Sequence, residues 1–337
     1  MPLRKKTLSK IFIFTIISLN LVIVEYNSFT EECIKYKGNP ILGDLKTGTL
    51  FDPFVIKDDN LYKMYISWRK EGAIAVSTSL DGYHWSELKI VLNKGVSQSW
   101  ESIVNRASIL SFNKKYYLWY TGQNNGKSKI GFAISENGYD FIKYKNNPVL
   151  IPEKDYEKES VMNPHVIYDN EEKIFKMWYA AGETYEPDVI CYATSKNGIN
   201  WKKYKNNPIL SRNSKKSSLD SFKVGGCDVH KISNKRYLMF YIGYSDIHTA
   251  RIFIAENKNG INNWKRHRNP IIKPDKGKFD SQACYKPAAL YNKNKNSWKI
   301  WYNGRANNKE FIGVAIYKKY KFIKFKNLFY IIKILFF

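Results

Sequence analysis

Carboxylic acids, amides and basic side chains recur at two kinds of place in this chain, immediately before short apolar segments and just after aromatic ones. The first set comprises Asp52-Pro53, Asn105-Arg106, Asn163-Pro164-His165, Cys227-Asp228 and Lys286-Pro287. The second set comprises Arg69, Glu71, Gln123, Glu183, Glu186, Asp188, Asp246, His248, Asn303, Arg305 and Glu310. Where a fold brings two carboxyl groups together, they can share the roles of proton donor and proton acceptor. Basic groups beside them can bind an anion.

The elements that carry these residues repeat along the chain. Five aromatic segments end in a tyrosine, namely Tyr62-Lys63-Met64-Tyr65, Tyr117-Leu118-Trp119-Tyr120, Lys176-Met177-Trp178-Tyr179, Leu238-Met239-Phe240-Tyr241 and Lys299-Ile300-Trp301-Tyr302. The final tyrosines are 55, 59, 62 and 61 residues apart. A period of this kind is the signature of a repeat architecture, in which each unit is one small group of strands or helices.

Each repeat also contains a second strand, a tight turn and a closing element. Segments rich in small residues follow the aromatic ones, at residues 130–135, 190–195 and 312–315. Turns come next at Asp81-Gly82, Asn137-Gly138, Asn197-Gly198 and Asn259-Gly260, and closing dipeptides stand at Asn39-Pro40, Asn147-Pro148, Asn207-Pro208 and Asn269-Pro270. Asn-Gly and Asp-Gly pairs supply the positive φ angles that tight hairpins need.

Four short strands in each of five repeats predict an all-β fold, a five-bladed β-propeller of four-stranded antiparallel blades over residues 31–318. No segment shows a convincing helical period, which argues against the α/β folds. The stretch Asn39-Pro40-Ile41-Leu42 matches the end of a repeat although it stands before the first one. We therefore expect it to complete the last blade and close the ring.

The two ends of the chain differ from the repeats. Arg4, Lys5 and Lys6 precede the apolar run 11–24, so residues 1–30 are predicted to be a secretory signal or a membrane anchor. This segment predicts a secreted or cell-envelope location, with membrane contact through the segment as a further expectation. Residues 319–337 form a basic and hydrophobic tail.

The propeller arrangement predicts where the polar residues meet. The first strand of each blade is innermost and successive strands are antiparallel, so the start of strand one and the loop between strands two and three open on the same face. Both sets of polar residues should therefore converge on one central pocket. A lectin-type propeller would repeat the same site in each blade, whereas these residues differ from blade to blade. That asymmetry favours a single catalytic pocket.

The five-unit pattern, together with Phe51-Asp52-Pro53, the Met/Trp-Tyr strands and the Ala-x-Ser-x-Asn-Gly turns, resembles the five-bladed glycoside hydrolases over about residues 39–317. The nearest group is the glycoside hydrolase family 43-like superfamily of arabinanases and β-xylosidases. The resemblance implies that Asp52 is the general base. Asn163 and His165 stand where that family has a pKa-tuning aspartate, and Gly225-Gly226-Cys227-Asp228 stands near the place of its general-acid glutamate.

Glycoside cleavage needs one carboxylic acid to protonate the leaving oxygen and one carboxylate either to activate water or to attack the anomeric carbon. We assign Asp52 as the base and Asp228 as the first choice for the acid, with Glu186 and Glu101 as rivals. The residues expected to bind substrate are Glu101, Asn105, Arg106, Asn163, His165, Glu183, Lys286 and Arg305. Trp68, Trp100 and Tyr185 are candidates for stacking on sugar rings.

The function predicted from these residues is that of a glycoside hydrolase acting on an oligosaccharide or polysaccharide. The basic residues leave a second reading open, a glycoside phosphorylase that uses inorganic phosphate, as in the mannoside phosphorylases that share this propeller. A third is a carbohydrate-binding propeller without catalysis. A hydrolase would release free sugar, a phosphorylase would release sugar 1-phosphate, and a binding propeller would bind a glycan without forming product.

The composition of the chain indicates which kinds of partner and cofactor to expect. The chain has 337 residues and a formal net charge of +25, but its lysines are spread over the whole length, so we do not expect a nucleic-acid partner. Four cysteines occur singly, which predicts buried thiols rather than a disulfide framework. The five histidines show no ligand spacing, so neither a metal nor another cofactor is expected.

Overall fold

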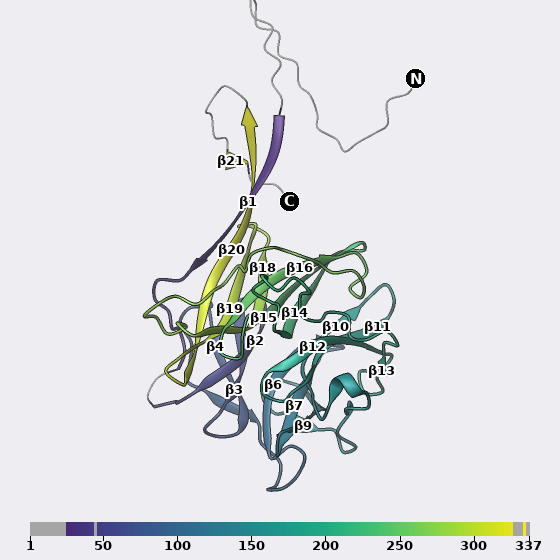
Figure 1. The fold of residues 1–337 in the computed structure, drawn as a ribbon. Helices are drawn as coiled ribbons and strands as arrows, with labels where there is room; N and C mark the ends of the chain where they lie inside the picture. The colour runs from purple at the N-terminus through teal and green to yellow at the C-terminus, as the bar shows by residue number, and fades with distance from the viewer. Residues whose placement is uncertain (1–24, 44–45, 326–332, 335–337) are drawn as a thin grey trace, which may run out of the picture.

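The computed structural model describes residues 25–43, 46–325 and 333–334, and their strands form five antiparallel sheets around a central axis (Figure 1). The predicted five-bladed β-propeller is confirmed. The first two blades comprise β2 (Leu50–Asp58), β3 (Leu61–Trp68), β4 (Ala73–Ser79) and β5 (Lys89–Leu92), then β6 (Ile103–Phe112), β7 (Lys115–Asn124), β8 (Lys127–Ser135) and β9 (Ile142–Lys143). The next two comprise β10 (Val161–Asp169), β11 (Ile174–Gly182), β12 (Pro187–Ser195) and β13 (Lys202–Lys203), then β14 (Lys223–Ser233), β15 (Arg236–Tyr244), β16 (Ala250–Asn257) and β17 (Lys265–Arg266).

The fifth blade joins the two ends of the described chain. It contains β18 (Ala283–Asn292), β19 (Ser297–Ala306), β20 (Lys309–Phe325) and, on its outer edge, β1 (Glu25–Lys35), while β21 (Lys333–Ile334) pairs with β20. The predicted role of the first Asn-Pro is confirmed, because Asn39 exchanges hydrogen bonds with the backbone of Val314 at 2.9 and 3.0 Å. Asn147 makes the same exchange with Phe132 in the second blade.

The ribbon of β1 and β20 extends beyond the body of the propeller (Figure 1). The predicted domain boundaries at residues 30/31 and 318/319 fall inside these two strands. Residues 1–24 of the predicted signal or anchor, and most of the predicted tail, lie outside the described residues. Among the residues that are described, no helix is long and apolar enough to cross a membrane.

Aromatic side chains of the second strands link each blade to the next. The indole N–H groups of Trp119, Trp178 and Trp301 donate to the carbonyl oxygens of Gly198, Gly260 and Gly82 at 2.7–2.9 Å. In the first blade Tyr65 donates to Gly138 O at 2.9 Å. These glycines belong to the Asp/Asn-Gly turns of the following blade, so the aromatic repeat and the turn repeat form one set of inter-blade contacts.

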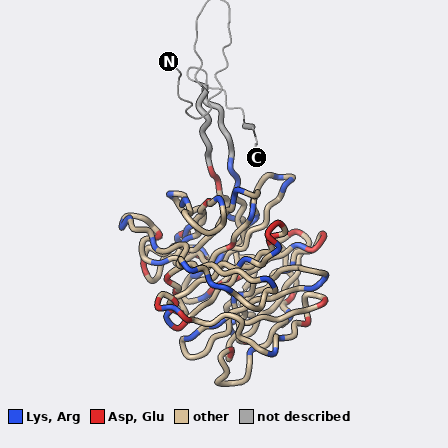
Figure 2. Tube along the Cα trace, turned by 90° about the vertical axis from the view of Figure 1, so that its right-hand side faces the viewer, with Lys and Arg blue, Asp and Glu red and all other residues tan. Residues whose placement is uncertain are grey.

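An acidic side chain hydrogen-bonds to the final tyrosine of the aromatic segment in four blades, and it is buried in three of them and partly exposed in the second blade. These acids are Glu101, Glu157, Asp220 and Asp280, and each accepts a hydrogen bond from that tyrosine at 2.6–2.9 Å and one from a lysine or arginine of the outer strand or ring-closing segment at 2.6–2.9 Å. Basic residues are otherwise dispersed around the body of the propeller (Figure 2). The framework therefore repeats both its aromatic and its ionic contacts.

Candidate active site

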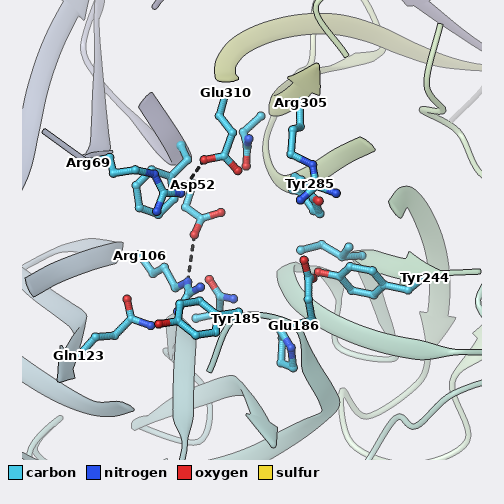
Figure 3. Close-up of a pocket in the computed structure, with 15 residues that line it drawn as sticks. Asp52, Arg69, Arg106, Gln123, Tyr185, Glu186, Tyr244, Tyr285, Arg305 and Glu310 are labelled. Atoms are coloured by element: carbon cyan, nitrogen blue, oxygen red, sulfur yellow. Dashed lines mark hydrogen bonds and ion pairs between the residues drawn. The ribbon is translucent and has the colours of Figure 1, made fainter. Parts of the chain in front are cut away.

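A central pocket of about 200 Å³ opens at one end of the propeller axis and receives side chains from all five blades (Figure 3). Its lining residues are Phe51, Asp52, Arg69, Arg106, Gln123, Asn163, Tyr185, Glu186, Pro187, Ile242, Tyr244, Tyr285, Asn303, Arg305 and Glu310. They come from the starts of the inner strands, the ends of the second strands, the starts of the third strands and the loops between second and third strands. The predicted convergence holds for four blades, whereas Cys227, Asp228, Asp246 and His248 of the fourth blade do not line the pocket.

Bulges at the start of the inner strands aim the side chains into this pocket. Pairing of β2, β6, β10 and β18 with their neighbours is interrupted by register shifts that contain Asp52, Arg106, Asn163 and Lys286, respectively. The φ angles of these four residues are 50°, 57°, 51° and 31°, in the left-handed region that non-glycine residues rarely adopt. Bulges and strained backbone of this kind re-aim side chains beside functional sites. Three of the four residues line the pocket.

Asp52 is held against a guanidinium group. Arg106 Nε donates to Asp52 Oδ2 at 3.0 Å, and both side chains are buried. The backbone N–H of Arg106 in turn donates to Ser67 Oγ at 2.8 Å, which fixes the arginine to the first blade. The result is an oriented carboxylate with a second oxygen, Oδ1, that no hydrogen bond of the described structure occupies.

Glu186 stands on another wall of the pocket in a different environment. Its carboxyl faces Tyr244 (Figure 3), and its Oε2 atom is buried without a hydrogen-bond partner. Burial raises the pKa of Glu186 above its ordinary value, and the Tyr244 hydroxyl with the positive charges of Arg305, Arg106 and Lys223 offsets only part of that effect. A carboxyl group of this kind retains its proton to higher pH than an exposed glutamate.

The rim of the pocket carries two further arginines. Arg69 pairs with Glu310 at 2.7 Å and lies over the ring of Phe51. Arg305 donates to the carbonyl of His248 at 2.8 Å and lies over the ring of Tyr285, 5.2 Å from its centroid. Within the described part of the chain, Arg305 forms no ion pair with a carboxylate. Its charge is therefore available to an anion in the pocket.

Several buried polar atoms around the pocket lack partners in the protein. They are Asn163 Oδ1, Tyr285 Oη, Asn303 Nδ2 and Glu186 Oε2. Buried polar groups are nearly always hydrogen-bonded, so such a group of donors and acceptors points to a polar ligand. Among the described residues, no three His, Cys, Asp or Glu side chains are grouped to hold a metal ion.

Of the eleven residues predicted to be catalytic or to bind substrate, five line the pocket and six do not. Asp52, Glu186, Arg106, Asn163 and Arg305 are brought together. Asn105 is buried beside the pocket and its amide donates to Gln123, which does line it. Glu101 belongs to the repeated acid–tyrosine contacts of the framework, where it binds Tyr120 and Lys143. Glu183 faces Lys223 in an ion pair of 2.5 Å outside the pocket.

The predicted acid Asp228 lies in a separate buried group on the inner strands, which we call the axial cluster: His165, Asp228, His230 and Lys286. Asp228 Oδ1 is 3.2 Å from both His165 Nδ1 and His230 Nε2, and Oδ2 accepts the backbone N–H of Ala289 at 2.5 Å. Asp228 and His165 are only 4% exposed and Lys286 is fully buried. Asp228 lies beyond the bulge of β14, and this position directs its side chain to the axis outside the pocket.

Charges within the axial cluster are balanced by their neighbours. Burial would raise the pKa of Asp228, but the two histidines and the Ala289 N–H outweigh it and lower that pKa to about 2. Burial lowers the pKa of His165 to about 4, with Asp228 opposing the shift and Lys286 and His230 adding to it. His165 Nε2 contacts the Val229 carbonyl at 2.9 Å, and Lys286 donates to Cys227 O at 3.3 Å. These contacts join the third, fourth and fifth blades.

Three apolar and aromatic residues of the pocket lining were not predicted from the sequence. Tyr244, Tyr285 and Ile242 line the pocket, yet they stand within or at the ends of strands whose aromatic residues otherwise pack in the core. The sequence did contain one signal for Tyr244. It stands at the end of the second strand of its blade, and the residues near that place in other blades are polar and line the pocket. Trp119, Trp178 and Trp301 are fully buried in the core.

Comparisons with known proteins agree with this fold. A family model described as "Glycosyl hydrolases family 32 N-terminal domain" matches residues 75–218. The 1,2-beta-oligomannan phosphorylase of Thermoanaerobacter sp. (strain X514) is 27% identical over 232 residues, which cover 65% of this chain and 71% of that protein.

Solved structures show the same architecture. A thermostable family-43 glycoside hydrolase matches with a TM-score of 0.64 at 18% identity, over 86% of this chain and 96% of that one. The beta-1,2-mannobiose phosphorylase of Listeria innocua, solved with beta-1,2-mannobiose, matches with a TM-score of 0.65 at 13% identity, over 84% and 96%. At these identities the likeness establishes the fold.

Fold and family match together show the class: the chain is a glycoside hydrolase-like five-bladed propeller. The predicted resemblance to the five-bladed glycoside hydrolases is confirmed at the level of the fold. The relative aligned over 65% of this chain is a 1,2-beta-oligomannan phosphorylase, and a solved structure of the same fold is a family-43 glycoside hydrolase, so proteins named for each of the two reactions are similar to this chain.

Proposed function

We propose that this protein hydrolyses glycosidic bonds of an oligosaccharide or polysaccharide in the central pocket. One observation carries the proposal: two carboxyl groups line the same pocket in contrasting environments. Asp52 is bound to Arg106, whereas Glu186 is unpaired at Oε2 and has a raised pKa. Acid/base cleavage of a glycoside requires one carboxyl group that can donate a proton and a second carboxylate that can accept one.

In the proposed reaction Glu186 is the acid and Asp52 is the base. Protonated Glu186 gives its proton to the glycosidic oxygen as the bond from that oxygen to the anomeric carbon breaks. Asp52 accepts a proton from the water that attacks the anomeric carbon, so the products are two free sugars and the two carboxyl groups exchange protonation states. Arg106 orients Asp52 through the bond from its Nε. Asp228 is replaced as the proposed acid because it does not line the pocket.

A substrate screen tests the proposal. The purified full chain is incubated with aryl glycosides, plant and bacterial polysaccharides, and β-1,2-mannobiose and β-1,2-mannotriose, in buffers that lack phosphate. Free reducing sugar is the expected product, and its identity would name the substrate. Binding of a glycan with no product after prolonged incubation would contradict catalysis and support a purely binding propeller.

A second candidate function is phosphorolysis. Arg305 lies at the pocket without a carboxylate partner among the described residues, and the relative with the longest of the reported sequence alignments is named a phosphorylase. In that reaction phosphate would replace water as the attacking group, and Glu186 would still protonate the leaving oxygen. Product that requires added phosphate, recovered as sugar 1-phosphate, would establish this function over hydrolysis.

We further propose that the protein is exported. The basic residues Arg4, Lys5 and Lys6 followed by the apolar run 11–24 support this. Expression of the full chain in a bacterium, followed by fractionation and N-terminal sequencing of the product, tests it. Recovery in the envelope or medium is expected, and recovery of an uncleaved chain in the cytoplasm alone would contradict export.

A further inference from the structure

The loop between β11 and β12 is fixed on both sides. Thr184 is buried, and its hydroxyl contacts Ser160 Oγ and donates to the carbonyl of Gly126. On the other side Lys223 pairs with Glu183 at 2.5 Å and with Asp188 at 3.1 Å, and donates to Glu186 O at 3.0 Å. The loop therefore holds its side chains in defined positions.

Tyr185 is exposed although its loop is fixed. It is 76% exposed. Across the described structure its ring takes part in no aromatic, cation–π or hydrogen-bond contact. Figure 3 shows the ring extending across the pocket toward Gln123, in front of Arg106. A large apolar ring in this state offers a flat surface to a ligand that has apolar and polar faces, as Tyr and Trp commonly do at binding sites.

A second depression adjoins the pocket behind Tyr185. It has a volume of about 530 Å³ and is lined by residues that include Gly126, Lys158, Glu159, Ser160 and Ile247. Tyr185 and Glu186 line both hollows. The proposed proton donor thus stands where the pocket and the depression meet, with the exposed ring as their shared wall.

We propose that Tyr185 is the platform for the sugar on the leaving side of the scissile bond, and that the depression behind it binds this sugar. The inference rests on the proposed function, because it takes Glu186 as the group that protonates the leaving oxygen. That oxygen must lie within hydrogen-bond reach of Glu186, so one sugar occupies the central pocket and the sugar that departs extends past Tyr185. The substrate class is then an oligosaccharide of at least two sugars, rather than a glycoside with a small leaving group.

The depression supplies groups suited to a sugar. Lys158 and Glu159 contribute charged groups to its lining, and Ile247, 43% exposed, contributes an apolar surface. Lys158 and Glu159 already pair with Asp188 at 2.7 Å and Lys127 at 3.1 Å, which orients their side chains. A pyranose or furanose has an apolar face that can stack on the Tyr185 ring and hydroxyl groups around its edge that can form hydrogen bonds with the polar residues.

Calorimetric titration of the full chain with trisaccharides and monosaccharides tests the platform. The probes are β-1,2-mannotriose, xylotriose and arabinotriose, with mannose, xylose and arabinose. We expect Tyr185→Ala to weaken binding of the preferred trisaccharide about tenfold, as loss of one aromatic contact would do. Tyr185→Phe should restore most of it because the ring remains. Leu80→Ala, which removes an exposed side chain outside both hollows, is the control.

Monosaccharide binding shows whether Tyr185→Ala removes only the contact with the second sugar or disrupts the whole binding site. A monosaccharide fills the central pocket alone, so Tyr185→Ala should change its affinity by less than about twofold while trisaccharide affinity falls. Equal losses for both sugars, or no loss for the trisaccharide, would overturn the inference. If the wild type binds a trisaccharide but releases no product, the proposed function fails while the platform stands. If it binds none of the probes, both fail.

Discussion

The central pocket and the axial cluster both place charged side chains from the inner strands near the propeller axis, but they differ in what satisfies those side chains. In the pocket, Glu186 Oε2, Asn163 Oδ1 and Tyr285 Oη have no partner in the protein. In the axial cluster, His165 Nδ1 and His230 Nε2 likewise make no hydrogen bond, but each lies 3.2 Å from Asp228 Oδ1, and Asp228 is 4% exposed and accepts a backbone N–H from Ala289. Position near the axis alone therefore does not make a carboxylate catalytic. It must also face an open pocket in which neighbouring polar groups are free to bind a ligand.

The largest expected difference is in turnover. Asp52→Asn removes the proposed base and should lower kcat/KM by about a hundredfold to ten-thousandfold, the usual contribution of a positioned acid or base. Asp228→Asn makes the same chemical change in the axial cluster and should leave the activity of the folded fraction within about twofold. Initial rates on the substrate found by the screen provide the measurement.

Loss of activity in both variants would erase the distinction between the two regions. Far-ultraviolet circular dichroism and a thermal melt of each variant serve as the control, since Asp52 also pairs with Arg106 and its replacement can affect folding.

Stability should show the opposite order. Asp228→Ala removes the buried partner of two histidines and of the Ala289 N–H, and breaking such a buried pair typically costs about 3–5 kcal/mol in the free energy of unfolding. Glu186→Ala removes a side chain with an unpaired oxygen and should cost less than about 1 kcal/mol, as expected away from satisfied networks. Urea unfolding followed by tryptophan fluorescence measures both, and a Glu186→Ala variant as unstable as Asp228→Ala would argue that the pocket is structural.

The pH dependence of stability isolates His165. Its folded pKa of about 4 lies below the ordinary histidine value of about 6.5. The unfolded chain therefore binds a proton that the folded chain does not, so the stability linked to His165 is complete above about pH 6.5 and is lost as the pH falls toward 4. His165→Gln should abolish this part of the decline, and the difference in Tm between wild type and variant should shrink between pH 7 and pH 4. A constant difference over this range would show that His165 does not stay neutral in the fold.

The smallest expected effect is a shift of the pH–rate profile. Arg305 lowers the otherwise raised pKa of Glu186, so Arg305→Gln should raise that pKa further. Since the acid must be protonated, the alkaline limb of kcat should move to higher pH by a fraction of a unit. The same limb in Arg212→Gln, which alters an arginine outside the pocket lining, provides the control, and an unchanged limb in Arg305→Gln would separate Arg305 from the acid.

Much of the architecture could be predicted from the sequence because the framework contacts repeat with it. Tryptophans and Asn-Gly turns recur in the sequence because they bond to each other between blades, as Trp119 does with Gly198. The pocket was predicted at the face where the starts of the first strands meet the loops between the second and third strands. This prediction correctly placed Asp52 and Glu186 in the pocket. The position of each bulge could not be predicted, and it decides which of two adjacent residues faces the pocket, so Arg106 lines it while Asn105 lies behind it.

Similar reasons explain the two misplaced acids. Asp228 stands beyond its bulge and is directed into the axial cluster. Glu101 recurs as Glu157, Asp220 and Asp280 in the other blades, each bound to the terminal tyrosine of a second strand. That recurrence was present in the sequence as an acid a few residues before each of four inner strands, and it marks framework rather than chemistry. Distances along the chain cannot show which acid has lost its partners, because burial and hydrogen bonding depend on the neighbouring blades.

The central claim, that Glu186 is the proton donor of the pocket, is tested most directly by varying the leaving group. The rates of wild type and Glu186→Gln are compared on the oligosaccharide substrate and on the 2,4-dinitrophenyl glycoside of the same sugar, whose leaving group departs without protonation. The oligosaccharide rate should fall by about a hundredfold or more, while the dinitrophenyl glycoside rate falls by less than about tenfold. Equal losses on both substrates, or this same pattern in Asp228→Asn, would contradict the assignment.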